Sequence, residues 1–153
     1  MAFTETFMLK PLPPFSLDLS AQVFSNGDKQ VRTYTNNEFS QVFIVDGCLV
    51  SAKITSIATV KQPQLYIELK ANKPITPEIK KATKQTITYV FNLNFDLFSF
   101  YKETAKDPVM HNVTQQLYGF KFPTTPTVFE GLIDAIVEPV SYTHLTLPTN
   151  REV

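Results

Sequence analysis

The apolar residues of this 153-residue chain change their spacing once, near Thr76. Before that position they mostly alternate with polar residues, which is the period of a half-buried β-strand. After it they recur at intervals of three and four, which is the period of an amphipathic helix. Runs of strands followed by runs of helices are typical of α+β folds or of two separate domains. We therefore expect an α+β chain whose sheet comes from its first half.

Four segments with alternating apolar residues are predicted to be strands: residues 3–9, 39–45, 48–55 and 64–70. The second and third flank Asp46-Gly47, and both residues of such a pair tolerate the positive φ that a two-residue hairpin turn requires. Residues 16–37 show no clean period. We expect a loop there, and a strand near residues 17–24 is the alternative.

Four helices are predicted from their start signals, at Thr76-Pro77, Asp96, Asp107-Pro108 and Thr127. Gly119 is expected to take a left-handed conformation after the third helix, and Thr127 with Glu130 has the spacing of a capping box. The apolar positions are Ile79, Ala82, Ile87 and Val90 in the first helix, Leu97, Phe100, Tyr101 and Ala105 in the second, Val109, Val113 and Leu117 in the third, and Phe129, Leu132, Ile133, Ile136 and Val137 in the last. The second set is expected to point inward. The last set has no later helix within the chain to pack against.

Composition restricts the location of the chain more than its partners. Lys+Arg and Asp+Glu both number 14, and this zero net charge removes the strongest compositional argument for a nucleic-acid or membrane-surface partner. A local patch can still bind where the average cannot. No apolar stretch approaches the roughly 18 residues of a membrane span. A single cysteine, Cys48, cannot form an internal disulfide, so we expect a cytoplasmic protein.

Individual side chains give little sign of catalysis. His111 has no cysteine or histidine near it in sequence, so we expect no metal site. Cys48 is interpreted as a small buried hydrophobe. Glu130 and Asp134, one turn apart, are interpreted as a helix cap and a solvated face instead of a catalytic carboxylate pair.

The one electrostatic feature is a group of lysines around the first predicted helix: Lys70, Lys73, Lys80, Lys81 and Lys84. Such a patch could position phosphate groups without conferring sequence specificity. Lysine on an exposed helix face is also ordinary, and we favour that interpretation.

The second half of the chain carries a family resemblance. Residues 92–101, 105–108, 117–123 and 126–138 follow the order seen in DNA-3-methyladenine glycosylase II, of the helix-hairpin-helix DNA glycosylase superfamily. Tyr118-Gly119 is similar to that family's connector, which leads through a proline-rich turn into a helix reading Phe-Glu-x-Leu-x-x-Ala-Ile, here residues 129–136. Residues 7–19 and Val45-Asp46-Gly47 resemble its N-terminal domain.

This resemblance implies an organisation and a function. Residues 1–93 would form a small antiparallel sheet with helices, similar to the TATA-binding-protein repeat, and residues 94–138 would begin an all-α catalytic domain. The family flips an alkylated purine out of double-stranded DNA and hydrolyses its bond to the sugar. An aspartate and a glycine-rich hairpin on a backbone phosphate carry this chemistry, without a cofactor, a metal, a membrane or an obligate protein partner.

Those catalytic motifs lie after Glu138 in the family, so we assign no catalytic residue and no DNA-binding residue to this chain. We expect the fragment alone to be inactive. An 8-oxoguanine-type glycosylase fragment is one alternative, and a non-enzymatic α+β interaction module is another. The module would bury the last predicted helix, whereas the fragment would leave Leu132, Ile133 and Ile136 exposed.

The end of the chain resembles something other than a protein. Residues 140–149 are similar to one translated reading frame of a transposon-end adapter used in sequencing libraries. We therefore expect residues 139–153 to be an artefact and genuine sequence to stop at Glu138. The adapter begins with CT, so the codon of Pro139 reads as one native C followed by adapter. The family's helix continues into Gln-Gln, and glutamine codons begin with C. The alternative is a real edge strand in which Thr143, Leu145 and Leu147 alternate.

Overall fold

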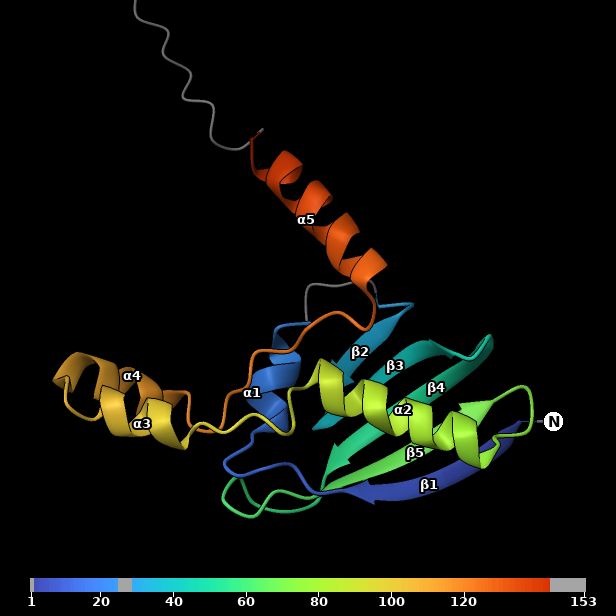
Figure 1. Cartoon of the computed structure of the whole chain (residues 1–153), viewed down its shortest axis with the longest axis horizontal. Helices are drawn as coiled ribbons and strands as arrows, with labels where there is room; N and C mark the ends of the chain where they lie inside the picture. The colour runs from blue at the N-terminus through green and yellow to red at the C-terminus, as the bar shows by residue number, and fades with distance from the viewer. Residues whose placement is uncertain (1, 25–28, 144–153) are drawn as a thin grey trace, which may run out of the picture.

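The computed structural model describes residues 2–24 and 29–143, with side chains described up to residue 136. Five strands form one antiparallel sheet in the order β1-β5-β4-β3-β2 (Figure 1). Their bounds are Phe3–Leu9 (β1), Arg32–Thr35 (β2), Glu38–Val45 (β3), Cys48–Ser56 (β4) and Leu65–Ala71 (β5). The helices are Leu17–Gln22 (α1), Pro77–Val90 (α2), Phe98–Thr104 (α3), Pro108–Gln116 (α4) and Val128–Thr143 (α5). The α+β prediction is confirmed.

The predicted hairpin is confirmed as β3 and β4. Val45 pairs with Cys48 across a two-residue turn, and Asp46 and Gly47 have φ values of 48° and 68°. Both values are positive, as the turn requires. The strands at the two ends of the first half, β1 and β5, are confirmed within one residue and pair with each other.

The segment without a clean period contains two elements that the sequence did not reveal. Residues 17–22 form helix α1, so the expected loop and the alternative of a strand near residues 17–24 are both wrong there. Ser16 caps this helix by accepting a hydrogen bond from Leu19 N at 3.3 Å. Strand β2 follows, and Asn36 and Asn37 turn the chain into β3 with φ values of 53° and 63°. Asparagine tolerates this conformation better than other residues with side chains.

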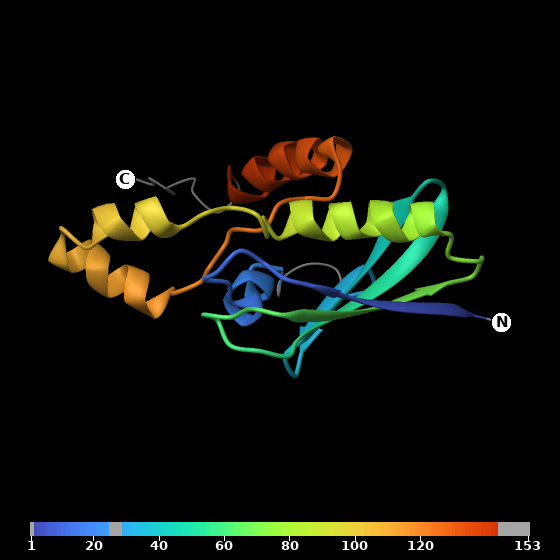
Figure 2. The ribbon, with the colours of Figure 1, turned by 60° about the horizontal axis from the view of Figure 1, so that its bottom comes forward.

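The core lies between the inner face of the sheet and the helices α1 and α2, and α2 runs along this face (Figure 2). Alternate residues of β3, β4 and β5 are buried there, together with Ile87 and Val90 of α2. The predicted cap of α2 is confirmed, because Thr76 Oγ1 accepts from Ile79 N at 3.3 Å. Just after α2, the ring of Phe91 packs edge-on against Phe39, with 5.0 Å between the centroids.

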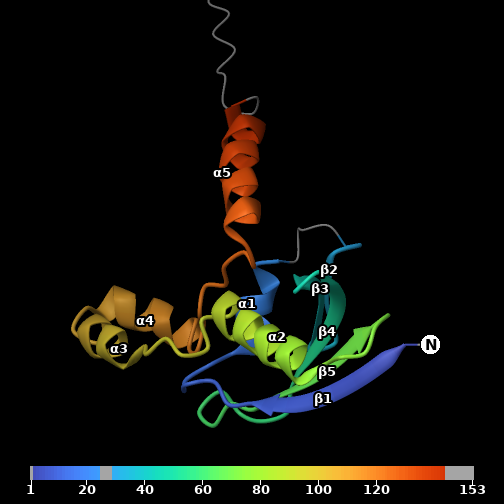
Figure 3. The same ribbon diagram turned by 45° about the vertical axis from the view of Figure 1, so that its right-hand side comes forward.

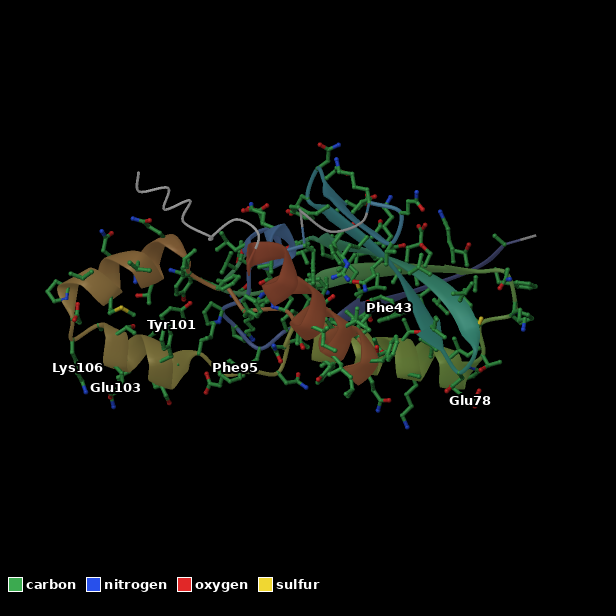
Figure 4. The ribbon with its side chains drawn as sticks, turned by 90° about the horizontal axis from the view of Figure 1, so that it is seen from above. Phe43, Glu78, Phe95, Tyr101, Glu103 and Lys106 are labelled. Atoms are coloured by element: carbon green, nitrogen blue, oxygen red, sulfur yellow. The ribbon has the colours of Figure 1, made fainter. Side chains whose placement is uncertain are left out.

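The three later helices stand apart from this core (Figure 3). α3 and α4 contact each other as a hairpin, and Tyr101 lies between them (Figure 4). Because this pair contacts little else, the prediction that Phe100 and Ala105 point inward is wrong, and Val109 is also exposed. α3 begins two residues after Asp96, whose Oδ1 accepts from Phe98 N at 2.8 Å.

Helix α5 projects away from the sheet, and its large apolar side chains up to Ile136 are exposed, with Leu132 at 56% and Ile133 at 42%. Thr127 Oγ1 accepts from Glu130 N at 3.1 Å, which is one of the two bonds of the predicted capping box. Pro139 and residues 140–143 continue the helix. The remainder of the suspected adapter, residues 144–153, lies outside the described residues, as do Leu145 and Leu147 of the alternative strand. Within the described part of the chain, no helix is long and apolar enough to cross a membrane.

Candidate functional site

The structure does not bring the candidate catalytic residues together. His111 is exposed on α4, and Cys48 is buried on the inner face of β4. Glu130 lies 3.6 Å from Arg32, whereas Asp134 is exposed on the next turn of α5. Among the side chains of residues 2–24 and 29–136, no group of three or more His, Cys, Asp or Glu could hold a metal ion.

The lysine group separates into paired and unpaired members. Lys70 lies 2.9 Å from Glu68, and Lys80 lies 2.8 Å from Glu5. Lys81 and Lys84 are exposed on the outer side of α2, with no ion pair among the described residues. With Gln85, Thr88, Tyr89 and Asn94 they line a shallow hollow of about 410 Å³.

A connector formed by residues 119–124 fixes the later helices to α1 and α2. Ser16 N donates to Gly119 O at 2.8 Å, and Thr124 N donates to Val90 O at 2.8 Å. The connector therefore bonds to the start of α1 and to the end of α2. Gly119 has the predicted left-handed conformation, with a φ of 85°. Its amide also donates to Tyr101 Oη at 2.9 Å, which links the α3–α4 hairpin to the same point.

Lys121, in the middle of this connector, is a buried cation that the sequence did not predict. Its side chain is only 2% exposed, and its Nζ donates to Leu12 O at 2.8 Å and to Leu93 O at 3.1 Å. Burial lowers the pKa of the ammonium group to about 8, and the charge of Asp96 opposes this shift in part. The flanking pattern Phe120-Lys121-Phe122 offered a weak signal, because a lysine between alternating aromatic residues can point inward.

An aromatic pocket of about 460 Å³ lies against the connector. Its lining residues are Asn92, Phe95, Leu97, Phe100, Phe120, Lys121 and Phe122. Asn92 has a φ of 49° and donates from Nδ2 to Phe122 O at 2.7 Å, so the end of α2 is tied to the connector at this pocket. The segment before α3 and the start of α3 supply the remaining lining residues. Mostly apolar pockets of this size with a few polar groups are typical of ligand sites.

Comparison with known proteins supports the fold. No protein-family model matches the chain, and no curated protein sequence matches it. Among solved structures, the chain is similar to a 3-methyladenine DNA glycosylase from Archaeoglobus fulgidus, with a TM-score of 0.69 and 14% sequence identity. The match covers 86% of this chain and 44% of that chain, so this chain spans less than half the length of the glycosylase. At this identity the likeness shows a shared α+β fold.

Proposed function

We propose that this chain is the N-terminal part of a DNA glycosylase that removes alkylated purines in base-excision repair. The structural match to a 3-methyladenine DNA glycosylase carries the proposal, because it extends over 86% of the chain. It thus includes helices after the sheet as well as the sheet itself. The resemblance of residues 117–136 to the family's connector and helix supports the same conclusion from the sequence.

In this proposal residues 1–93 form the accessory domain and residues 94–138 begin the catalytic domain. The complete enzyme would bind damaged double-stranded DNA and hydrolyse the N-glycosidic bond of a flipped base. The aspartate and the helix-hairpin-helix would come from sequence after Glu138. Residues 139–153 would be translated adapter, and the 153-residue chain would be inactive alone.

The exposed face of α5 favours this proposal over a self-contained interaction module. A module would bury Leu132, Ile133 and Ile136, whereas all three are more than two-fifths exposed. Such a face is expected to pack against further helices of a catalytic domain.

Two measurements test the proposal. Long-read sequencing of the locus across codon 138 should reveal a frame that continues into Gln-Gln and later into a helix-hairpin-helix with an aspartate. The protein expressed from that frame should release 3-methyladenine from methylated DNA, and the 153-residue chain should release none. A genomic stop after Val153, or base release by the chain alone, would contradict the proposal. Release of 8-oxoguanine but not of alkylated bases would favour the 8-oxoguanine-type alternative.

A further inference from the structure

Two hollows on the surface meet at one short turn. Asn92 and Phe95 line the aromatic pocket, and Asn94, between them in sequence, lines the hollow on α2. Phe95 N donates to Asn92 O at 2.9 Å, so these residues form a compact turn. The two hollows therefore lie next to each other, at the end of α2 and the segment before α3, where Figure 4 labels Phe95. We call this combined surface the α2 groove and define it by Lys81, Lys84, Tyr89, Asn94, Phe95 and Phe122.

One end of the α2 groove is positively charged. Lys81 and Lys84 are three residues apart on α2, and side chains at this spacing are neighbours on a helix surface. Their charges are not neutralised by an ion pair among the described residues. The nearest acid along the helix, Glu78, has a pKa lowered by a hydrogen bond with Thr76, so it stays charged and reduces the net charge of this end to about one unit.

The other end of the α2 groove presents aromatic rings to solvent. Tyr89, Phe95 and Phe122 are 58%, 59% and 66% exposed, although rings of this size are usually buried. Exposed rings beside unpaired lysines are the combination with which proteins hold single-stranded nucleic acids, because lysine attracts the phosphates and each unstacked base can lie on a ring. The bases of a duplex already stack on one another and cannot use such rings.

We infer that the α2 groove binds single-stranded DNA, with Lys81 and Lys84 on the phosphates and Phe95 and Phe122 against the bases. The inference rests on the proposed function only in the choice of DNA over RNA. Around a lesion, such a surface would hold a locally opened strand. This role requires no catalytic residue in the chain.

Fluorescence anisotropy with a labelled deoxythymidine 12-mer tests the inference on the 153-residue chain, with a 12-base-pair duplex as competitor. We expect the single strand to bind more tightly than the duplex. Lys81→Gln with Lys84→Gln should weaken binding by about 10-fold or more at 50 mM NaCl. The slope of log affinity against log salt concentration should become shallower by about 1.4, because each phosphate contact contributes about 0.7. Phe95→Ala or Phe122→Ala should weaken binding by about 5-fold or more without changing the slope.

Matched controls lie away from the α2 groove. Lys53→Gln with Lys70→Gln removes the same formal charge from the outer face of the sheet, where both lysines are ion-paired with glutamates, and Phe129→Ala removes an exposed ring from α5. Equal effects of groove and control variants, tighter binding of the duplex, or tighter binding of a uridine 12-mer would each overturn the inference. Because the assay measures binding by the short chain, its failure is distinct from a failure of the extended protein to release alkylated bases.

Discussion

The ammonium group of Lys121 donates a hydrogen bond to the carbonyl oxygen of Leu93 across 28 positions of sequence, at 3.1 Å. The same nitrogen bonds to Leu12 O at 2.8 Å. One side chain thus joins the segment after β1, the end of α2 and the connector to the later helices. These bonds explain how a lysine can be buried without a carboxylate partner, since buried polar groups need hydrogen bonds.

Replacement of this lysine should destabilise the fold. Lys121→Met keeps an unbranched side chain but leaves Leu12 O without its partner, so we expect the free energy of unfolding to fall by about 1–3 kcal/mol. Urea denaturation followed by circular dichroism measures the change. Lys84→Met, on the exposed face of α2, should change it by less than about 0.5 kcal/mol. A Lys121→Met protein as stable as the original would show that the two bonds contribute nothing.

Stability should rise with pH above 8. The folded-state pKa of Lys121 is about 8, below the ordinary value of 10.5, so between these values the unfolded chain binds more protons than the folded one. Unfolding therefore becomes less favourable as pH rises from 8 to 10. A neutral amine still has two N–H donors for its two carbonyl acceptors, so deprotonation need not break the bonds. Thermal unfolding at several pH values should show this rise, and Lys121→Met should lack it.

Gly119 should tolerate no side chain. A Cβ there would lie 2.5 Å from Val60 Cγ1 and 3.0 Å from Ser16 N, and the φ of 85° is strained for any other residue. We expect Gly119→Ala to lower the free energy of unfolding by about 2–5 kcal/mol. Gly47 is the matched control, because its φ is 68° but a Cβ there would meet nothing within 4 Å. Gly47→Ala should cost only the backbone strain of about 1–2 kcal/mol. Equal losses would exclude a steric role for Val60.

The exposed face of α5 should drive self-association. Leu132 and Ile136 are both 56% exposed and lie one turn apart. Leu132→Lys with Ile136→Lys should keep the chain monomeric at concentrations where the original protein associates, with little loss of stability. Light scattering and sedimentation measure this difference. Asn112→Lys with Gln116→Lys adds the same charge to polar positions of α4. If that variant is equally monomeric, net charge and not the apolar face is responsible.

Local signals in the sequence predicted the elements whose form depends on neighbouring residues. Asp46-Gly47 specified the turn between β3 and β4 because few residue pairs accept two positive φ values. Thr76-Pro77 specified the start of α2 through a cap and a first turn that requires no proline N–H. The short helix α1 was missed because Leu17 and Leu19 alternate, and the cap at Ser16 is one residue that many loops also contain.

Burial was the property that local patterns predicted least well. Val109 and Val113 have helical spacing, yet both are exposed, because spacing shows which residues share a face and not whether anything covers it. The same limit applies to the α2 groove. Its lysines are close in sequence, but Phe122 joins them only because the connector bonds to the end of α2.

The sequence by itself determined the α+β class, the central hairpin, the starts of α2 and α4, and the left-handed conformation of Gly119. Each of these depends on backbone conformations and hydrogen bonds within a few residues. Only the tertiary structure decided that Lys121 is buried, that Lys70 and Lys80 are paired while Lys81 and Lys84 are not, and that the aromatic pocket exists. These features arise where segments far apart in sequence meet, and long-range packing sets the burial and the charge partners of a side chain there.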